Sequence, residues 1–121
     1  MSETSGNVFL FKSEKDTRSY KRGEAIFREG EAGSEMFAVQ QGWVDLMVGG
    51  KLVETVAPGG IFGEMSLIDG APRSATAVAG EDCRVVAIDE KRFNQLTQSM
   101  PNFALNVLRV ISQRIRVMDR L

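Results

Sequence analysis

The stretch from Gly59 to Ala77 reads GGIFGEMSLIDGAPRSATA, and it decides how the rest of the chain is interpreted. It combines a glycine-rich turn, an acidic residue, a short apolar run of one or two helical turns and an arginine that follows a proline. The turn and the helix start expose backbone N–H groups, which attract anions. Arg73 offers a planar, two-pronged donor, and Glu64 accepts hydrogen bonds from hydroxyl groups. A ligand that uses all three features carries a phosphate and a sugar hydroxyl.

The overall composition limits the classes of protein that the chain can represent. With 121 residues, 43% of them hydrophobic, it has the size of one domain and enough apolar side chains for a core. Its formal net charge is -1, so no overall basic surface is available to hold nucleic acid or an anionic membrane. No apolar run approaches the roughly 18 residues that cross a bilayer, and the N-terminus lacks the apolar core of a signal peptide. These features predict a cytoplasmic protein.

Histidine is absent, and Cys83 is the only cysteine. The absence of histidine excludes His-assisted serine and cysteine hydrolases and metal sites built on imidazole. A single cysteine cannot form an internal disulfide, which agrees with a reducing compartment, and its apolar neighbours indicate a small core residue. The sequence therefore predicts a protein with no enzymatic activity, no metal and no cofactor.

The glycines divide the chain into two parts. Eleven of the twelve fall between Gly23 and Gly80, and the last 41 residues contain none. Short segments between glycine turns indicate β-strands of a sandwich or rolled barrel, and Gly49-Gly50 is a hairpin signal. The predicted strands are Thr17 to Tyr20, Ala25 to Arg28, Glu35 to Gln41, Trp43 to Val48, Lys51 to Ala57, Ser74 to Ala79 and Cys83 to Asp89.

The residues after position 88 have the pattern of two helices. Asp89 is suited to cap the first helix, and Pro101 ends it and suits the first turn of the second. Apolar residues of the second helix follow alternating steps of four and three, and others widen this face. The first series is Ala104, Leu108, Ile111, Ile115 and Met118, and the second is Phe103, Val107, Val110 and Leu121.

The final helix carries more apolar and basic residues than one packed face needs. Its arginines are Arg109, Arg114, Arg116 and Arg120, and most of them are interpreted as the solvated face of an amphipathic helix. The wide apolar face indicates that the last helix packs against a further group besides the β-strands. Three candidates remain open: the base of a ligand, a second subunit and a downstream domain.

The motif from Gly59 to Ala77 resembles the phosphate-binding cassette of cyclic-nucleotide-binding domains, as in protein kinase A regulatory subunits, the bacterial catabolite activator protein and cyclic-nucleotide-gated channels. The resemblance covers nearly the whole chain. YKRGEAIFREGE, from Tyr20 to Glu31, is similar to the opening strands and turn of the family, and Gly33 and Gly42-Trp43-Val44 fall at its next turns. The resemblance implies an α+β fold: a jelly-roll-like antiparallel β-roll of about eight short strands, a short cassette helix and C-terminal helices.

The resemblance also implies a single domain over residues 1–121. Residues 1–15 are expected to form an N-terminal arm or short helix. Residues 16–89 are expected to form the β-roll, with the cassette at 59–77, and residues 90–121 the two C-terminal helices.

The implied ligand is a 3′,5′-cyclic nucleotide, which has one free ribose hydroxyl and a singly charged phosphodiester. In the family, the acid at the position of Glu64 accepts from the 2′-hydroxyl, and the arginine at the position of Arg73 pairs with the phosphate. Backbone N–H groups at the helix start add further donors. The predicted ligand-binding residues are Gly63, Glu64, Met65, Ser66, Arg73, Ser74 and Ala75.

The choice of base depends on Ser74 and on apolar contacts. In the family, threonine immediately after the arginine favours guanine and alanine goes with adenine, so Ser74 matches neither pattern. Cyclic AMP is predicted, with cyclic GMP as the alternative. Candidates for the wall beside the base are Leu46, Met47 and Val53, and candidates for its cap are Arg116, Val117 and Leu121.

The implied mechanism is a population shift in which the cassette and the C-terminal helices move together, with a hinge near Pro101 and a relay through Leu67 or Ile68. The sequence thus predicts a non-enzymatic sensor domain with a downstream effector domain or protein partner. The alternatives are a nucleotide-free interaction scaffold and the regulatory part of a larger transcription factor, channel or kinase. A cupin-type enzyme is disfavoured because such sites use imidazole ligands. Neither nucleic acid nor a membrane is an expected partner, and the oligomeric state stays open.

Overall fold

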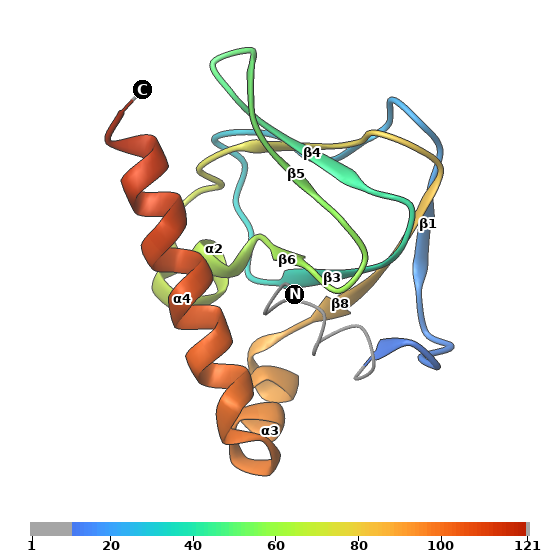
Figure 1. The fold of residues 1–121 in the computed structure, drawn as a ribbon, viewed down its shortest axis with the longest axis vertical. Coiled ribbons are helices and arrows are strands. Elements are labelled where there is room, and N and C mark those ends of the chain that lie inside the picture. Colours follow the sequence, from blue (N-terminus) through green and yellow to red (C-terminus); the bar gives the residue numbers. More distant parts are fainter. Residues whose placement is uncertain (1–10, 121) are drawn as a thin grey trace.

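Two four-stranded antiparallel sheets and a set of helices make up the structure, a computed structural model that describes residues 11–120 (Figure 1). One sheet has the strand order β1-β8-β3-β6, and the other has the order β2-β7-β4-β5. The predicted α+β fold with a β-roll is therefore confirmed. The strands are β1 (Arg18–Tyr20), β2 (Ala25–Phe27), β3 (Met36–Gln41), β4 (Val44–Val48), β5 (Lys51–Val56), β6 (Ile61–Phe62), β7 (Thr76–Ala79) and β8 (Cys83–Ile88), and the helices are α2 (Glu64–Asp69), α3 (Glu90–Ser99) and α4 (Pro101–Met118).

Seven of the eight strands agree with the predicted segments to within two residues at each end. The predicted hairpin joins β4 to β5, and both of its glycines, Gly49 and Gly50, have positive φ. The strand that was not predicted is β6, which pairs with β3 through Ile61 and Phe62. Two residues are too few to show an alternating pattern, so this strand carries no signal of its own.

The interior consists of two apolar clusters, one on each face of the sheet that contains β3. Phe37 and Val39 belong to the cluster between the two sheets, together with residues of β2, β4 and β7. Met36 and Ala38 face the other way and pack against residues of α2, α3 and α4. The alternation along β3 thus separates two buried faces, because the helices cover the second one.

The two C-terminal helices begin as predicted. The carboxylate of Asp89 accepts from the N–H of Arg92 at 2.9 Å and caps α3, and Pro101 occupies the first turn of α4. The prediction of which apolar residues of α4 face the protein was only partly right. Leu108 and Ile115 are 60% and 48% exposed, and the buried residues of α4 are Phe103, Val107 and Arg114. The helix is therefore rotated so that an apolar strip stays outside.

The N-terminal arm falls mostly outside the described residues. Phe11, the first described residue, is 2% exposed and lies in the cluster beneath the helices. Within residues 11–120, no helix is long and apolar enough to cross a membrane. In Figure 1, α4 runs along one side of the β-roll and passes α2, and this arrangement positions the site.

Candidate functional site

The site is built around the turn between β6 and α2. Gly63 occupies this turn with a φ of 78°, in the left-handed region that other residues rarely adopt. A Cβ at this position would also lie 2.9 Å from Nη1 of Arg73 and 3.3 Å from the carbonyl oxygen of Glu35. Glycine is therefore needed both for the backbone conformation and for the close approach of Arg73. The next residue, Glu64, begins α2.

Arg73 is buried against aromatic rings and keeps an unpaired donor. The residue is 6% exposed, and its guanidinium carbon lies 4.1 Å from the centre of the Phe27 ring. Nη1 donates to the carbonyl oxygen of Gly63 at 3.0 Å, but the buried Nε has no hydrogen-bond partner among residues 11–120. Because a buried donor without a partner is costly, this nitrogen marks a place for an acceptor from a ligand.

The electrostatic environment of Arg73 leads to the same conclusion. Burial lowers the pKa of its guanidinium, and the negative charges of Glu35, Glu31 and Glu64 oppose this shift without cancelling it. Neither a carboxylate hydrogen bond nor an ion pair to Arg73 exists within the described chain. The positive charge is therefore desolvated and incompletely compensated, which favours the binding of an anion.

Two backbone hydrogen bonds and one glycine hold Arg73 in place. Its N–H donates to the carbonyl oxygen of Glu31 and its carbonyl oxygen accepts from the N–H of Gly30, both at 2.8 Å. The Arg73 guanidinium lies so close to Gly33 that a Cβ on this glycine would overlap it. The sequence placed Gly33 at a turn but gave no sign that it makes room for the arginine, because that contact is visible only in three dimensions.

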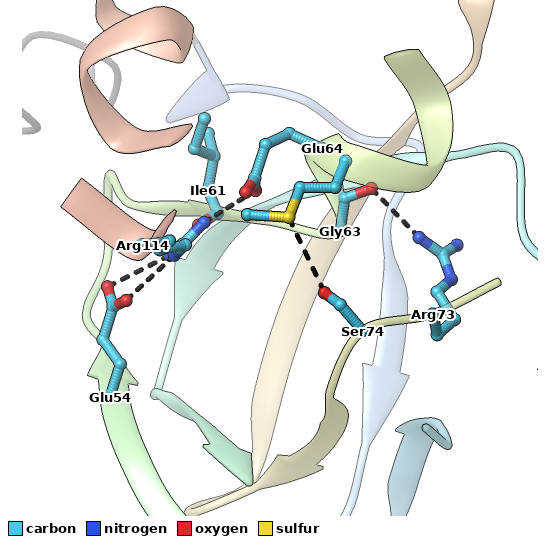
Figure 2. A network of polar contacts seen from close by, with 8 residues as sticks. Glu54, Ile61, Gly63, Glu64, Arg73, Ser74 and Arg114 are labelled. Carbon is cyan, nitrogen blue, oxygen red and sulfur yellow. Dashed lines mark hydrogen bonds and ion pairs between the residues drawn. The ribbon is translucent and has the colours of Figure 1, made fainter. Parts of the chain in front are cut away.

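Glu64, the other charged residue predicted for the site, is paired with Arg114 of α4. Oε1 of Glu64 accepts from Nη1 of Arg114 at 2.6 Å, and Glu64 is 1% exposed (Figure 2). Arg114 also donates to the carbonyl oxygen of Ile61 at 2.6 Å and to both carboxylate oxygens of Glu54, at 2.9 and 3.0 Å. Burial acts to lower the pKa of Arg114, but the hydrogen bonds and charges of the two glutamates outweigh burial and raise it. One side chain thus joins β5, β6, α2 and α4.

Arg114 is the exception to the predicted solvated face of the last helix. It is 7% exposed, whereas Arg109, Arg116 and Arg120 are exposed. A signal for its burial was present in the sequence, since Arg114 follows the buried Val107 by seven residues, about two helical turns, and so shares its face. The acidic partners were not predictable, because Glu54 and Glu64 lie 60 and 50 residues away along the chain.

A single pocket between α2, α4 and the sheet that contains β4 and β5 is lined by Glu54, Glu64, Arg73 and Arg114 together with other residues. It is a partly open hollow, and the space not occupied by atoms amounts to about 520 Å³ when the part open to solvent is included. Ser74 lies at its edge, exposed, with Oγ 3.7 Å from the sulfur of Met65 (Figure 2). All seven residues predicted to bind a ligand line this pocket: Gly63, Glu64, Met65, Ser66, Arg73, Ser74 and Ala75.

The side of the pocket away from Arg73 is mainly apolar. Of the residues predicted for its wall, Leu46 and Val53 line the pocket and Met47 does not. Among the predicted caps, Val117 lines the pocket, Arg116 does not, and Leu121 lies outside the described residues. The sequence missed four lining residues: Phe27, Glu54, Arg114 and Met118.

The polar groups of the pocket are suited to binding. Glu54 and Glu64 are the pocket's two acids, and Arg114 hydrogen-bonds both, so neither is a free acid or base for chemistry on a ligand. Within residues 11–120, no three side chains of His, Cys, Asp or Glu are grouped to hold a metal ion. The arrangement fits a ligand with an anionic group at Arg73, a hydroxyl near Glu64 and a ring against the apolar wall.

Comparisons with known proteins point to one family. The sequence profile of the cyclic nucleotide-binding domain matches residues 17–100. The chain is 36% identical over 107 residues to the cyclic AMP receptor protein of Thermus thermophilus, a match that covers 84% of this chain and 50% of the relative. The chain spans half or less of the length of this relative and of two cAMP-dependent protein kinase regulatory subunits that it also matches.

Solved structures with the same fold support this match. A structure described as cAMP bound PfPKA-R superposes with a TM-score of 0.78 and 26% identity, over 97% of this chain and 44% of the other. A second structure, described under a cyclic-GMP-dependent signalling pathway that regulates bacterial phytopathogenesis, has a TM-score of 0.73 and 31% identity. That match covers 95% of this chain and 93% of the other.

Proposed function

The chain belongs to the cyclic nucleotide-binding domain family, and on this premise we propose that its pocket binds a 3′,5′-cyclic nucleotide, with cyclic AMP as the ligand, and does not cleave it. The observation that carries the proposal is the unpaired, buried Nε of Arg73. An exocyclic phosphate oxygen would accept from this nitrogen and from the neighbouring N–H groups of the guanidinium fork. The negative charge of the phosphate would also compensate the positive charge of Arg73, which is buried away from water.

The start of α2 supplies further donors for the same phosphate. Gly63 lets the backbone come close, and the N–H groups of Glu64, Met65 and Ser66 lie in the first turn, where no intrahelical acceptor precedes them. These residues and Arg73 line one pocket. In this proposal the phosphate lies between the first turn of α2 and the guanidinium.

Glu64 is the proposed acceptor for the ribose 2′-hydroxyl. Arg114 occupies its Oε1, and no other described residue donates to this carboxylate, so Oε2 is left for a ligand. The ion pair with Arg114 holds this buried carboxylate in place. Loss of the 2′-hydroxyl would leave Oε2 buried without a partner, which gives preference for a ribose over a deoxyribose.

The apolar part of the pocket is the proposed site of the base. Leu46 and Val53 on one side and Val117 and Met118 on the other offer contact area without hydrogen-bonding groups. Such a surface favours the less polar adenine over guanine, because guanine would bury more polar atoms without partners. The named ligands of the receptor from Thermus thermophilus and of the PfPKA-R structure agree with this choice.

The proposed output is the position of α4. A nucleotide in this pocket contacts α2 at its phosphate and α4 at its base, so it favours the arrangement in which both lie against it. Leu67 of α2 is 9% exposed and packs in the cluster that also holds Leu96 of α3 and Phe103 of α4, so it is the relay. Ile68, the other candidate, is 51% exposed. In this proposal residues 1–121 belong to one cyclic-nucleotide-binding domain.

Titration calorimetry with cyclic AMP and cyclic GMP tests the proposal directly. Wild-type protein is expected to bind cyclic AMP more tightly than cyclic GMP, and Arg73→Ala is expected to lose at least about a hundredfold in affinity for both. The 2′-deoxy analogue of cyclic AMP is expected to bind about tenfold or more weakly, since Glu64 loses its partner.

Two outcomes would reject this function. The first is the absence of measurable binding of either nucleotide to folded wild-type protein. The second is equal affinity of wild type and Arg73→Ala, since the phosphate would then be bound elsewhere. Linear 5′-AMP serves as the control ligand, because it carries the same base with a differently placed phosphate and no ring to fit between α2 and Arg73.

A further inference from the structure

Glu54 accepts more hydrogen bonds from Arg114 than any other described residue does. The proposed binding of a nucleotide assigns no role to Glu54. Both of its carboxylate oxygens accept from Arg114, from Nε at 2.9 Å and from Nη2 at 3.0 Å, whereas Glu64 receives one hydrogen bond. A two-pronged pair of this kind fixes the plane of the guanidinium as well as its distance. Glu54 therefore determines the orientation of Arg114 more than Glu64 does.

Few contacts join the last turn of α4 to the sheet of β4 and β5. Phe103 and Val107, in its first half, pack on the sheet that contains β3, but Ile115 and Val117 are exposed. In Figure 1 this end of the helix stands clear of α2. Among the hydrogen bonds and ion pairs within residues 11–120, only those between Arg114 and Glu54 join α4 to the sheet of β4 and β5.

The same turn forms part of the pocket. Val117 and Met118 line it from α4, opposite Leu46 and Val53 of the sheet that carries Glu54. Arg114 lies one turn before Val117 and Met118, so its attachment to Glu54 sets how closely these two side chains approach the sheet. The contact between Arg114 and Glu54 therefore contributes to the width of the apolar part of the pocket.

We propose that Glu54 is a positioning residue that, through Arg114, favours the arrangement in which the last turn of α4 lies over the pocket, so that it biases the same equilibrium that a nucleotide shifts. Its consequence for affinity rests on the proposed function, but its effect on α4 does not. Glu54 is 41% exposed on its side chain while Arg114 is 8% exposed, so the contact lies at the edge of the protein, where it can open and close without exposing the main core.

The position of α4 in the absence of a nucleotide follows from this role. Glu64 belongs to α2, so its contact with Arg114 responds to a ligand bound there, whereas Ile61 of β6 and Glu54 of β5 hold Arg114 from outside α2. Glu54 therefore raises the fraction of ligand-free protein in which the pocket is closed, and the apparent affinity for a ligand rises with that fraction.

Residue-resolved amide hydrogen exchange on Glu54→Gln tests the proposal without any ligand. Gln is nearly isosteric and keeps one acceptor, but it loses the second charged oxygen. The amides from Arg114 to Met118 are expected to exchange about tenfold faster than in wild type, while those of β3 and β8 stay unchanged. Glu81→Gln is the matched control, because it removes the same charge from an exposed loop where Glu81 contacts only the next residue's N–H.

Nucleotide binding gives a second readout. Glu54→Gln is expected to weaken cyclic AMP and cyclic GMP by the same factor, about three- to tenfold, mostly through faster dissociation. Saturating nucleotide is expected to restore slow exchange in α4 of the variant. In an Arg114→Lys background, where a two-pronged pair cannot form, Glu54→Gln is expected to add little.

Three results would overturn the proposal. The first is unchanged exchange at the end of α4 in Glu54→Gln. The second is a change in the ratio of the two affinities, because Glu54 would then contact the base itself. The third is full additivity with Arg114→Lys. If neither nucleotide binds wild-type protein, the proposed function fails, and the exchange experiment still decides the role of Glu54.

Discussion

Two buried arginines face the same pocket, and they differ in what they leave unsatisfied. Arg114 donates four hydrogen bonds, three to carboxylate oxygens and one to a carbonyl oxygen. Arg73 donates one, to the carbonyl oxygen of Gly63, and its Nε has no partner within residues 11–120. Arg114 and Arg73 are thus almost equally buried, at 7% and 6% exposure, but every guanidinium nitrogen of Arg114 has a hydrogen-bond partner and Nε of Arg73 has none among the described residues.

The difference separates a structural role from a binding role. Removal of a fully paired buried cation leaves its anionic partners unpaired, so the folded state loses stability. Removal of a buried cation that lacks partners does not destabilise the folded state in this way. The protein instead loses affinity for the anion that this cation would bind. The two arginines should therefore respond to matched substitutions in different measurements.

The largest expected effect is on the stability of Arg114→Met. Methionine keeps the length of the side chain, but Glu64 would remain buried without its cation, at an expected cost of about 3–5 kcal/mol in the free energy of unfolding. Urea denaturation measures this loss. The added substitution Glu64→Gln is expected to recover part of it, because it removes the stranded charge. A loss below about 1 kcal/mol would mean that water screens the ion pair between Arg114 and Glu64, as it does for a pair on the surface.

Arg73→Met is expected to show the opposite behaviour. Its free energy of unfolding should stay within about 1 kcal/mol of wild type, since methionine can pack on the Phe27 ring and no charged partner is abandoned. Its affinity for cyclic AMP should fall by about 2–5 kcal/mol, which calorimetry measures. Arg18→Met is the control, because Arg18 pairs with Glu35 outside the pocket. A strongly destabilised Arg73→Met would remove the contrast between the two arginines.

The contrast also shows where sequence reasoning succeeds. The residues around Arg73 were identified because they belong to one contiguous motif, from Gly63 to Ala75, that resembles the phosphate-binding cassette of the family. The strand pattern, the Asp89 cap and the break at Pro101 were likewise local signals. Each of these features depends on residues within a few positions of one another.

Features that depend on distant partners were missed. Most arginines of the last helix were assigned to a solvated face because a charged residue on a helix is usually exposed, and the contacts that bury Arg114, with Glu54 and Glu64, were not foreseen. The strand β6 exists because β3 pairs with it, since two residues have no preference of their own. Contacts between remote segments are a property of the tertiary structure, so no local pattern indicated them.

Gly33→Ala offers a way to displace Arg73 without removing it. A methyl group at this position would overlap the guanidinium, which lies at the end of a flexible side chain and can swing away at little cost to folding. Affinity for cyclic AMP is expected to fall about tenfold, or about 1.4 kcal/mol, with almost unchanged stability. Gly80→Ala is the matched control, because its methyl group would displace the exposed Trp43. Equal affinities of the two variants would show that the position of Arg73 is not critical.

The smallest expected effects are at Ser74, where neither arginine is involved. Its hydroxyl is exposed and makes one weak contact, with the sulfur of Met65 at 3.7 Å, so Ser74→Ala should change stability by less than about 0.5 kcal/mol. Ser74→Thr restricts the side-chain rotation and fixes the hydroxyl at the pocket edge. It is expected to raise the affinity for cyclic GMP relative to cyclic AMP by about threefold, a difference of less than 1 kcal/mol. Competition binding with both nucleotides measures this ratio. Since the change adds no charge and breaks no ion pair, a larger shift would assign the choice of base to Ser74 and not to the apolar wall.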